Sequence, residues 1–220
     1  MNIEPVAIFH GPMKEKFGIP RQAGLAPALG GEVRFAPPYD AAEAVRGLDG
    51  FDYCWLIWGF SKAAGGRSGL TVRPPRLGGN ERMGVFATRS PFRPNGLGLS
   101  CVKLESVEPG VLHVSGADLL DGTPIYDVKP YVAYADSREG ARSGFVDAVC
   151  WDALEVEMPD ECAALLSASE RQALAEVLSL DPRPAYKEDG ENVYGMVFGA
   201  FNVKFSVDGR KLLVHSVEKY

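Results

Sequence analysis

The segment VRPPRLGGNERMGVFATRSPFRPNGLG, residues 72–98, is the most informative part of this chain. It combines five arginines, five glycines and four prolines with a single carboxylate, Glu81. Arginine head groups stay in water or on an anionic partner, because burying an unpaired charge is costly. Glycine and proline favour turns in which the backbone approaches another molecule closely. The composition therefore indicates a binding site for phosphate or for a nucleotide.

Basic charge is concentrated around this segment. Residues 62–103 carry eight lysines and arginines and one acid, a local net charge of +7, whereas the whole chain has a net charge of −6. The remaining residues therefore carry −13. This asymmetry favours an anion-binding face on an otherwise acidic protein. The alternative is that these arginines pair with carboxylates elsewhere in the fold.

Length and composition predict a globular protein in the cytoplasm. The chain has 220 residues, 46% of them hydrophobic, which suits one large domain or a main domain with a smaller one. The longest apolar run, Tyr53–Phe60, is far shorter than the roughly 20 residues that a membrane span needs. The N-terminus has no basic region followed by an apolar one, so we expect no secretory signal and no membrane partner.

Cysteine and histidine give no sign of a metal site. The cysteines at 54, 101, 150 and 162 lie far apart without a CxxC pair, and the three histidines form no HxH or HExxH pattern. We expect buried, reduced thiols and no bound metal.

The first two-thirds of the chain, residues 1–150, has the pattern of short strands separated by turns. Turn signals such as Pro37-Pro38, Pro109-Gly110 and Asp121-Gly122 recur at short intervals. Eight or so strands in about 140 residues predict a mainly β fold, either a closed barrel or a sandwich. The candidate strands are Val6–Phe9, Glu32–Phe35, Tyr53–Phe60, Leu70–Arg73, Met83–Thr88, Leu99–Leu104, Val111–Ser115 and Val128–Val132. Tyr53–Phe60 is apolar on both faces, which predicts a central strand.

Residues 151–220 differ in character and predict a small α+β appendage. Ser167 and Glu170 form a capping box, and leucine and valine follow at helical spacing. Apolar residues then alternate on both sides of Asp208-Gly209 within residues 203–214, which is a strong hairpin signal.

Two familiar nucleotide motifs are excluded. Gly79 and Gly84 have the spacing of a P-loop, but Val85 stands where that loop needs lysine. Gly96 and Gly98 are followed by Cys101 rather than by the third glycine of a dinucleotide fingerprint.

A site assembled from several loops is the alternative. Residues 21–24 offer a guanidinium, an amide and a permissive backbone, and residues 89–95 hold two arginines in a proline-stiffened loop. Residues 118–124 present two carboxylates and a hydroxyl, which suit ribose hydroxyls or an ammonium group. The other interpretation of this last segment is a turn that only reverses the chain.

The chain resembles the TrmO/TsaA-like family, tRNA N6-threonylcarbamoyladenosine methyltransferases. The resemblance covers most of residues 1–137 and the start of the C-terminal appendage. The segments that carry it are KEKFGIPRQAG (14–24), PYDAAEAVRGLDGFDYCWLIWGF (38–60), TVRPPRLGGNERMGVFATRSPFRPN (71–95), DLLDGTPIYDVKPYVAYADS (118–137) and DPRPAY (181–186).

The resemblance implies a single-sheet β-barrel that works as a homodimer. It implies S-adenosylmethionine as cofactor and N6-methylation of threonylcarbamoyladenosine next to the anticodon of tRNA. By the same resemblance, the cofactor-binding residues are Gln22, Ala23, Gly24, Phe60, Ser61, Arg89, Leu99, Asp118, Asp121, Gly122 and Thr123. Two departures stand out: Ser61 replaces a histidine common in the family, and Gly96-Leu97-Gly98 replaces Pro-Ile-Gly.

The implied reaction assigns further roles. The candidates for a base that takes the proton from the exocyclic nitrogen are Asp118 and Asp121, with Tyr126 behind them. Arginines grip RNA phosphates or pair with the threonine carboxylate of the modified base, and the candidates are Arg73, Arg76, Arg82 and Arg93. Anticodon-loop bases stack on aromatics such as Phe92 or Tyr131, although Phe92 is equally suited to anchoring its loop in the core.

Two competing functions stay open at this point. One is a non-catalytic RNA-binding β-barrel, which accounts for the basic segment but not for the acidic loop. The other is an S-adenosylmethionine-dependent methyltransferase that acts on a different acceptor.

Overall fold

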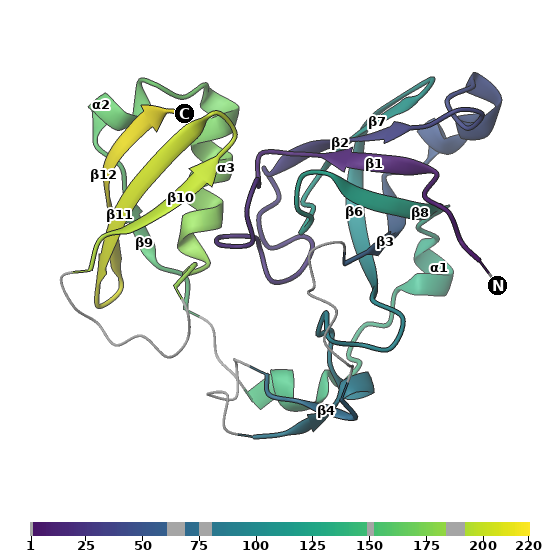
Figure 1. The fold of residues 1–220 in the computed structure, drawn as a ribbon, viewed down its shortest axis with the longest axis horizontal. Coiled ribbons are helices and arrows are strands. Elements are labelled where there is room, and N and C mark those ends of the chain that lie inside the picture. Colours follow the sequence, from purple (N-terminus) through teal and green to yellow (C-terminus); the bar gives the residue numbers. More distant parts are fainter. Residues whose placement is uncertain (1, 61–68, 75–80, 149–151, 184–191) are drawn as a thin grey trace.

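A computed structural model describes residues 2–60, 69–74, 81–148, 152–183 and 192–220. The fold is mainly β, with a closed six-stranded antiparallel barrel followed by a smaller unit of four strands and two helices (Figure 1). This confirms the predicted barrel with an α+β appendage. The sandwich alternative is wrong, because the barrel strands form one closed sheet.

The barrel strands follow the order β1-β2-β7-β6-β3-β8. Their bounds are β1 (Ala7–His10), β2 (Gly30–Phe35), β3 (Tyr53–Gly59), β6 (Leu97–Glu108), β7 (Val111–Ser115) and β8 (Thr123–Pro130). Strand β3 is predicted from its apolar sequence and pairs with β6 and β8; in a closed barrel every strand has two neighbours, so none is central. Its side chains Cys54, Leu56 and Trp58 are buried inside the barrel.

The register of β3 against β6 makes room for a large ring at one end of the barrel. Trp58 lies opposite Gly98, and a Cβ placed on Gly98 would come within 2.3 Å of the indole. A glycine is therefore required there for the ring to lie flat against the neighbouring strand.

The arginine-rich segment departs from the predicted pattern of strands. Residues 70–73 and 83–88 contribute only β4 (Thr71–Val72) and β5 (Met83–Gly84), which pair with each other outside the barrel. The chain then turns into the short 3-10 helix η4 (Val85–Ala87). The prediction of a strand over Met83–Thr88 is thus largely wrong, because the six barrel strands close on themselves and leave no edge for it to join.

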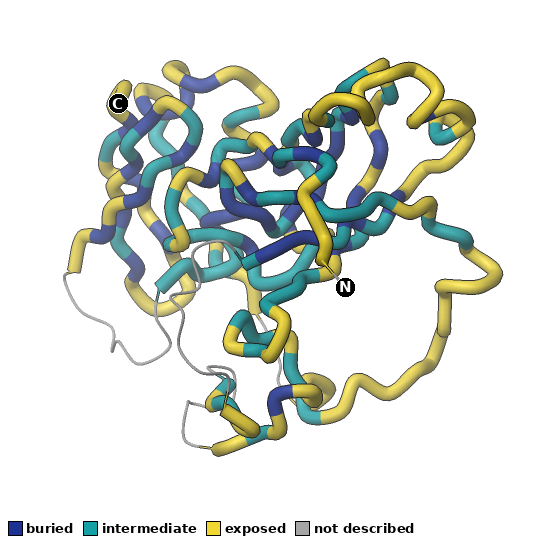
Figure 2. Tube along the Cα trace, turned by 45° about the vertical axis from the view of Figure 1, so that its right-hand side comes forward, coloured by how far each residue is buried: buried dark blue, intermediate teal, exposed yellow. Residues whose placement is uncertain are grey.

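Short helical elements fill the connections around the barrel. They are η1 (Ala42–Val45), η2 (Leu48–Gly50), α1 (Ala133–Asp136) and η5 (Gly144–Ala148). Buried residues concentrate along the strands of both units, whereas the loops are largely exposed (Figure 2). None of the helices in the described ranges is long and apolar enough to cross a membrane.

The C-terminal unit has the sheet order β10-β11-β12-β9. Its elements are β9 (Glu155–Glu157), α2 (Asp160–Ala163), α3 (Ala168–Ser179), β10 (Tyr194–Phe198), β11 (Phe201–Asp208) and β12 (Lys211–Lys219). The predicted capping box opens α3: the Glu170 N–H donates to Ser167 Oγ at 3.3 Å, and the Ser167 N–H donates to Glu170 Oε2 at 2.9 Å. The predicted hairpin joins β11 to β12, with Gly209 at a φ of 55°.

Residues 11–29, between β1 and β2, connect the two units, and we call them the bridging segment. Met13, Ala26 and Leu29 are at most 2% exposed, yet they belong to the core of the C-terminal unit rather than to the barrel core. The hydrophobic core of the C-terminal unit is therefore completed by residues from the N-terminal part of the chain.

This arrangement predicts that Leu29→Ala destabilises the protein strongly. Truncating a fully buried leucine leaves a cavity and costs about 2–5 kcal/mol. The free energy of unfolding, measured by circular dichroism in urea, is expected to fall by that amount. The control is Leu70→Ala, since Leu70 is 88% exposed. Equal stability of the two variants would contradict the assignment of Leu29 to the core.

Candidate functional site

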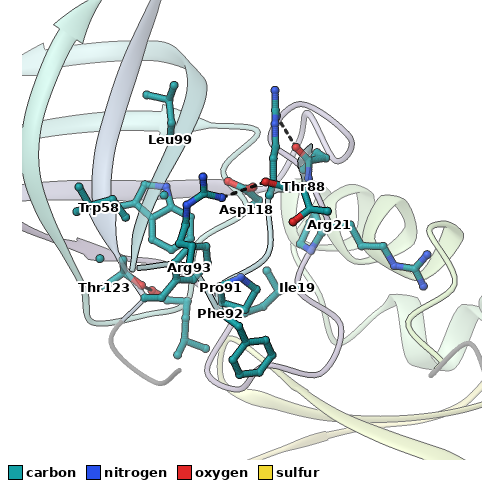
Figure 3. A pocket seen from close by; sticks show the side chains of 18 of the residues that line it. Ile19, Arg21, Trp58, Thr88, Pro91, Phe92, Arg93, Leu99, Asp118 and Thr123 are labelled. Carbon is teal, nitrogen blue, oxygen red and sulfur yellow. Dashed lines mark hydrogen bonds between the residues drawn. The ribbon is translucent and has the colours of Figure 1, made fainter. Parts of the chain in front are cut away.

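A cavity of about 700 Å³ lies where the bridging segment meets one end of the barrel. Figure 3 shows side chains from several loops and strands converging on it. Five parts of the chain line it. The bridging segment contributes Lys16, Ile19, Pro20, Arg21 and Gln22, β3 and the residue after it contribute Trp55, Trp58, Gly59 and Phe60, and residues 86–93 contribute Phe86, Thr88, Arg89, Pro91, Phe92 and Arg93. The start of β6 adds Leu97, Gly98 and Leu99, and the loop after β7 with the first residue of β8 adds Asp118, Leu120 and Thr123. The volume falls in the range typical of sites for small molecules and cofactors.

A chain of hydrogen bonds fixes the carboxylate in this cavity. Trp58 Nε1 donates to Ser100 Oγ at 2.9 Å, and Ser100 Oγ donates to Asp118 Oδ1 at 2.5 Å. Ser100 is only 1% exposed, so its hydroxyl has no competing water. The tryptophan and the serine thus hold Asp118 in one orientation toward the cavity.

The environment of Asp118 perturbs its acidity. Burial raises the pKa of this carboxyl above its ordinary value. The hydrogen bond from Ser100, backbone N–H groups and the positive charge of Arg89 lower the pKa but do not cancel the effect of burial. A partly buried carboxylate with a raised pKa is typical of a functional site.

Arg89 joins two of the loops around the cavity. Its Nη1 donates to Gln22 Oε1, which links the loop at residues 88–95 to the bridging segment. The same loop is held by its own hydrogen bonds, since Arg93 Nη1 donates to the Thr88 carbonyl at 3.0 Å and the Phe92 N–H donates to Ser90 Oγ at 3.2 Å. The proline-stiffened loop is therefore further ordered around its two arginines.

Aromatic side chains supply the apolar walls. Trp58 and Phe60 are in edge contact, with ring centroids 4.4 Å apart. Phe86 is 77% exposed and Phe92 is 53% exposed, and both line the cavity. The interpretation of Phe92 as an anchor in the core is therefore wrong. Exposed rings beside this cavity suit stacking against a planar base.

Most of the predicted cofactor residues meet in this cavity. Gln22, Phe60, Arg89, Leu99, Asp118 and Thr123 line it. Ala23 and Gly24 follow Gln22 directly, and the Gly24 N–H donates to the Gly116 carbonyl at 2.8 Å, which holds this turn against the barrel. Ser61 lies outside the described residues.

Three other predicted residues are not among the described residues that line the cavity. Asp121 accepts hydrogen bonds from the Gly11 N–H at 3.1 Å and from Lys14 Nζ at 2.9 Å. Burial pushes its pKa upward, but these bonds and the charges of Lys14 and His10 outweigh burial and hold the pKa below its ordinary value. The described cavity lining does not include Asp121.

Gly122 and Tyr126 also lie away from the described lining. The Gly122 N–H donates to the Phe9 carbonyl at 2.9 Å, with φ at 76°, so this glycine serves the turn. Tyr126 packs over Gly59, where a Cβ would lie 2.8 Å from its ring. Both interpretations of residues 118–123, a binding loop and a chain-reversing turn, therefore hold in part. Asp118 and Thr123 line the cavity, and the turn between them reverses the chain.

The arginines assigned to RNA occupy two places. Arg73 and Arg82 lie exposed on the β4-β5 ribbon, where Arg82 Nη1 donates to Thr71 Oγ1 at 2.9 Å, whereas Arg93 lines the cavity. Arg76 lies outside the described residues. Within the described ranges, no salt bridge joins Arg73, Arg82 or Arg93 to a carboxylate. Their charges are therefore available to an anionic partner.

The other titratable groups add no further chemistry to this site. Cys54, Cys101 and Cys162 are free thiols, and burial raises the pKa of Cys54 to about 12. Cys150 lies outside the described residues. In the part of the chain that the structure describes, no three metal-ligating side chains come together.

Sequence reasoning missed Ser100 and the role of Trp58. The signal for Ser100 is a lone hydroxyl at an inward position of β6, between Gly98 and Val102. A buried serine in such a strand needs a partner, and that partner comes from a distant loop. Tyr131, in turn, packs on Tyr53 and Trp55 and is not among the described cavity residues.

Comparisons with known proteins agree with this geometry. The tRNA-methyltransferase O N-terminal domain matches residues 8–137, and the TrmO C-terminal domain matches residues 152–220. The chain is 44% identical over 193 residues to a putative S-adenosylmethionine-dependent methyltransferase, RcsF, of Pseudomonas aeruginosa, covering 85% of this chain and 84% of that protein. It is 39% identical over 227 residues to the tRNA (adenine(37)-N6)-methyltransferase of Escherichia coli strain K12, covering 98% of this chain and 97% of the relative.

Solved structures give the same result. The crystal structure of TrmO from P. aeruginosa superimposes with a TM-score of 0.81 at 35% identity, covering all of this chain and 97% of that one. Both the barrel and the C-terminal unit are thus shared with a solved relative. The chain belongs to the tRNA-methyltransferase O family.

Proposed function

We propose that this protein transfers a methyl group from S-adenosylmethionine to N6 of threonylcarbamoyladenosine, next to the anticodon of tRNA. The observation that carries the proposal is the cavity, whose lining brings Arg89 and Asp118 together with the exposed rings of Phe86 and Phe92. The relatives named as methyltransferases for S-adenosylmethionine and for tRNA adenine support the same reaction. A barrel that only binds RNA does not require a partly buried carboxylate that is held by a buried serine.

The residues of the cavity fit the cofactor by their chemistry. Aromatic walls suit its adenine, and the pair Arg89 and Gln22 suits its carboxylate. When bound, S-adenosylmethionine supplies an electrophilic methyl group on a sulfonium. The protein then chiefly aligns donor and acceptor, an effect that contributes about 7–11 kcal/mol in well-oriented reactions.

We assign Asp118 as the group that takes the proton from the exocyclic nitrogen. Of the three candidate bases, Asp118 is the one that lines the cavity. Its pKa is raised toward neutral pH, where a general base works best. The threonylcarbamoyl group helps by making the N–H more acidic. Ser100 and Trp58 keep the accepting carboxylate in place.

Arginines outside the cavity would hold the tRNA backbone. Arg73 and Arg82 lie on the β4-β5 ribbon, which projects from the barrel (Figure 1). The exposed rings of Phe86 and Phe92 are placed to stack on a base splayed out of the anticodon loop. A homodimeric assembly, which rests on the family resemblance, and action in the cytoplasm, which is expected from the composition, complete the proposal.

The reaction is tested by mass spectrometry of tRNA nucleosides. Purified protein is incubated with S-adenosylmethionine and with tRNA that carries or lacks the threonylcarbamoyl group. A gain of one methyl group on the modified adenosine, and none on the unmodified one, supports the proposal. Methylation of neither tRNA, in a protein that binds the cofactor, would point to a different acceptor.

Arg89→Ala is expected to lower methyl incorporation into tRNA by a factor of about 100 or more, the loss typical of removing a preorganised charged donor. The fold is expected to stay intact, because the Arg89 side chain is exposed. Far-ultraviolet circular dichroism and the urea midpoint check this. Arg46→Ala is the matched control and should keep full activity, because the Arg46 side chain is exposed and directly follows η1, away from the cavity lining. Wild-type activity in Arg89→Ala would contradict the assigned role.

Asp118→Asn is expected to lower kcat by a factor of about 100 or more while changing the Kd for S-adenosylmethionine much less. The amide keeps the shape of the carboxylate but does not take up the proton. Single-turnover rates and isothermal titration separate the two quantities. A large rise in Kd with unchanged kcat would instead make Asp118 a cofactor anchor.

The same variant is expected to be more stable than the wild type at neutral pH in the absence of cofactor. The pKa of Asp118 is raised in the folded protein, so the folded state binds its proton more tightly than the unfolded state. The protonated Asp118 side chain therefore stabilises the folded protein at pH values below the pKa that it has in the unfolded chain. This stabilisation is lost as the pH rises through the pKa that it has in the folded protein. Urea unfolding should show that Asp118→Asn is more stable than the wild type at pH 7 but not near pH 3.5. Equal stability of the two proteins at both pH values would contradict a destabilising charge at this position.

Replacing Arg73 and Arg82 together by alanine is expected to weaken binding to tRNAs of any sequence to a similar extent. Each lost phosphate contact should reduce the magnitude of the slope of log K against log salt concentration by about 1, so that binding becomes less sensitive to salt. Fluorescence titrations at several salt concentrations measure this slope. Arg171→Ala, exposed on α3, is the control. An unchanged slope in the double variant would remove these arginines from the RNA interface.

A further inference from the structure

We infer that the C-terminal unit, residues 152–220, holds the cofactor-facing part of the bridging segment in place, with Glu15 and Glu176 as positioning residues. The inference deepens the proposed function and rests on the cavity being the cofactor site. The described residues of the C-terminal unit contribute nothing to the cavity lining, whereas the bridging segment contributes Lys16, Ile19, Pro20, Arg21 and Gln22. The unit therefore acts on the site through this segment.

Apolar packing holds one side of the bridging segment. Met13 and Leu29 are buried in the core formed by α3 and the C-terminal sheet, and Phe17 and Ile19 pack against the same core. The rings of Phe17 and Phe205 are stacked with centroids 6.4 Å apart. Met13 and Leu29 flank residues 16–22 in the sequence, and Phe17 and Ile19 lie within that stretch.

Two carboxylates fasten the segment at points that flank the cavity residues. Glu15 Oε1 accepts a hydrogen bond from the Val197 N–H on β10 at 2.9 Å. Glu176 Oε2, on α3, accepts one from the Ala28 N–H at 2.7 Å, and its Oε1 is oriented by Gln172 Nε2 at 3.1 Å. Hydrogen bonds to charged acceptors are among the stronger ones in proteins.

Backbone and side-chain contacts complete the attachment. The Gly199 N–H donates to the Pro12 carbonyl at 2.8 Å, next to the bridge between Met13 and Phe198. Arg21 extends from the cavity toward the C-terminal unit (Figure 3). Its Nη2 donates to the Asp181 carbonyl at 3.4 Å.

The opposite side of the segment is tied to the barrel. The Asp121 N–H donates to the Met13 carbonyl at 2.8 Å, and Lys14 pairs with the Asp121 carboxylate. The Gly24 N–H donates to the Gly116 carbonyl. The segment is thus held between two units, and residues 16–22 span the gap at the cavity.

Such an arrangement couples cofactor binding to docking of the C-terminal unit. A ligand that contacts residues 16–22 only when they are held in place also stabilises the contacts that hold them, because coupling between two sites is reciprocal. Weakening these contacts should in turn weaken cofactor binding while sparing the groups that carry out the chemistry.

The first test uses the full-length double variant Glu15→Ala/Glu176→Ala. Its Kd for S-adenosylmethionine, measured by isothermal titration, is expected to rise by about tenfold or more, with kcat at saturating cofactor close to that of the wild type. Glu15→Gln/Glu176→Gln should recover most of the affinity, since the amide oxygen still accepts a hydrogen bond. Glu157→Ala, exposed on β9 at the far edge of the sheet, is the control.

The second test uses the wild type and needs no variant to fold. Amide hydrogen exchange followed by NMR is compared with and without S-adenosylmethionine. The Val197 and Gly199 amides, outside the described cavity lining, are expected to exchange more slowly with cofactor bound. Protection at Ala23 and Gly24 alone, with Val197 and Gly199 unchanged, would overturn the inference.

The two tests separate this inference from the proposed function. Absence of cofactor binding by the wild type would refute the proposed function itself. Normal binding by the wild type, with equal affinity in the Glu15→Ala/Glu176→Ala variant, would refute only the positioning role. A higher Kd in the alanine variant that the glutamine variant reverses supports it.

Discussion

The hydrogen bond from Ser100 to Asp118 is the contact on which the site depends. It joins the inner face of a barrel strand to the loop after β7, and it places a carboxylate at a cavity whose described lining contains no other carboxylate. Ser100 is itself fixed by the Trp58 indole, and the indole fits because Gly98 lies opposite it. The closure of the barrel therefore determines where the only strongly held carboxylate among the described cavity residues lies.

The other half of the site comes from outside the barrel sheet. The bridging segment leaves β1, packs its apolar residues into the C-terminal core and returns to β2, carrying Gln22 past the loop that holds Arg89. A barrel alone would leave this wall of the cavity unsupported. The C-terminal unit thus belongs to the architecture of the site even though its described residues do not line it.

Local patterns in the sequence predicted the parts of the fold that local physics controls. The apolar run at residues 53–60 formed most of strand β3, the pair Ser167 and Glu170 capped α3, and Asp208-Gly209 formed the hairpin. The family resemblance also predicted that Gln22, Arg89, Asp118 and Thr123 belong to one site, and these four residues line one cavity. Such features depend on spacing within a few residues or on an extended motif.

Features set by long-range pairing escaped prediction. The role of Ser100 depends on strand register and on a loop that follows the next strand. Asp121 resembles Asp118 in sequence, yet Lys14 and the Gly11 N–H turn it away from the cavity. The insertion of Met13 and Leu29 into a core formed mainly by residues beyond 150 has no signature in the segment itself. These contacts emerge only when distant elements are packed together.

The most direct test of the central claim is a crystal structure of the protein with S-adenosylmethionine or its demethylated product. We predict the ligand in the cavity between Gln22, Arg89 and Asp118, with its adenine against the aromatic wall. Occupancy at any other location, with this cavity left empty at saturating ligand, would contradict the account.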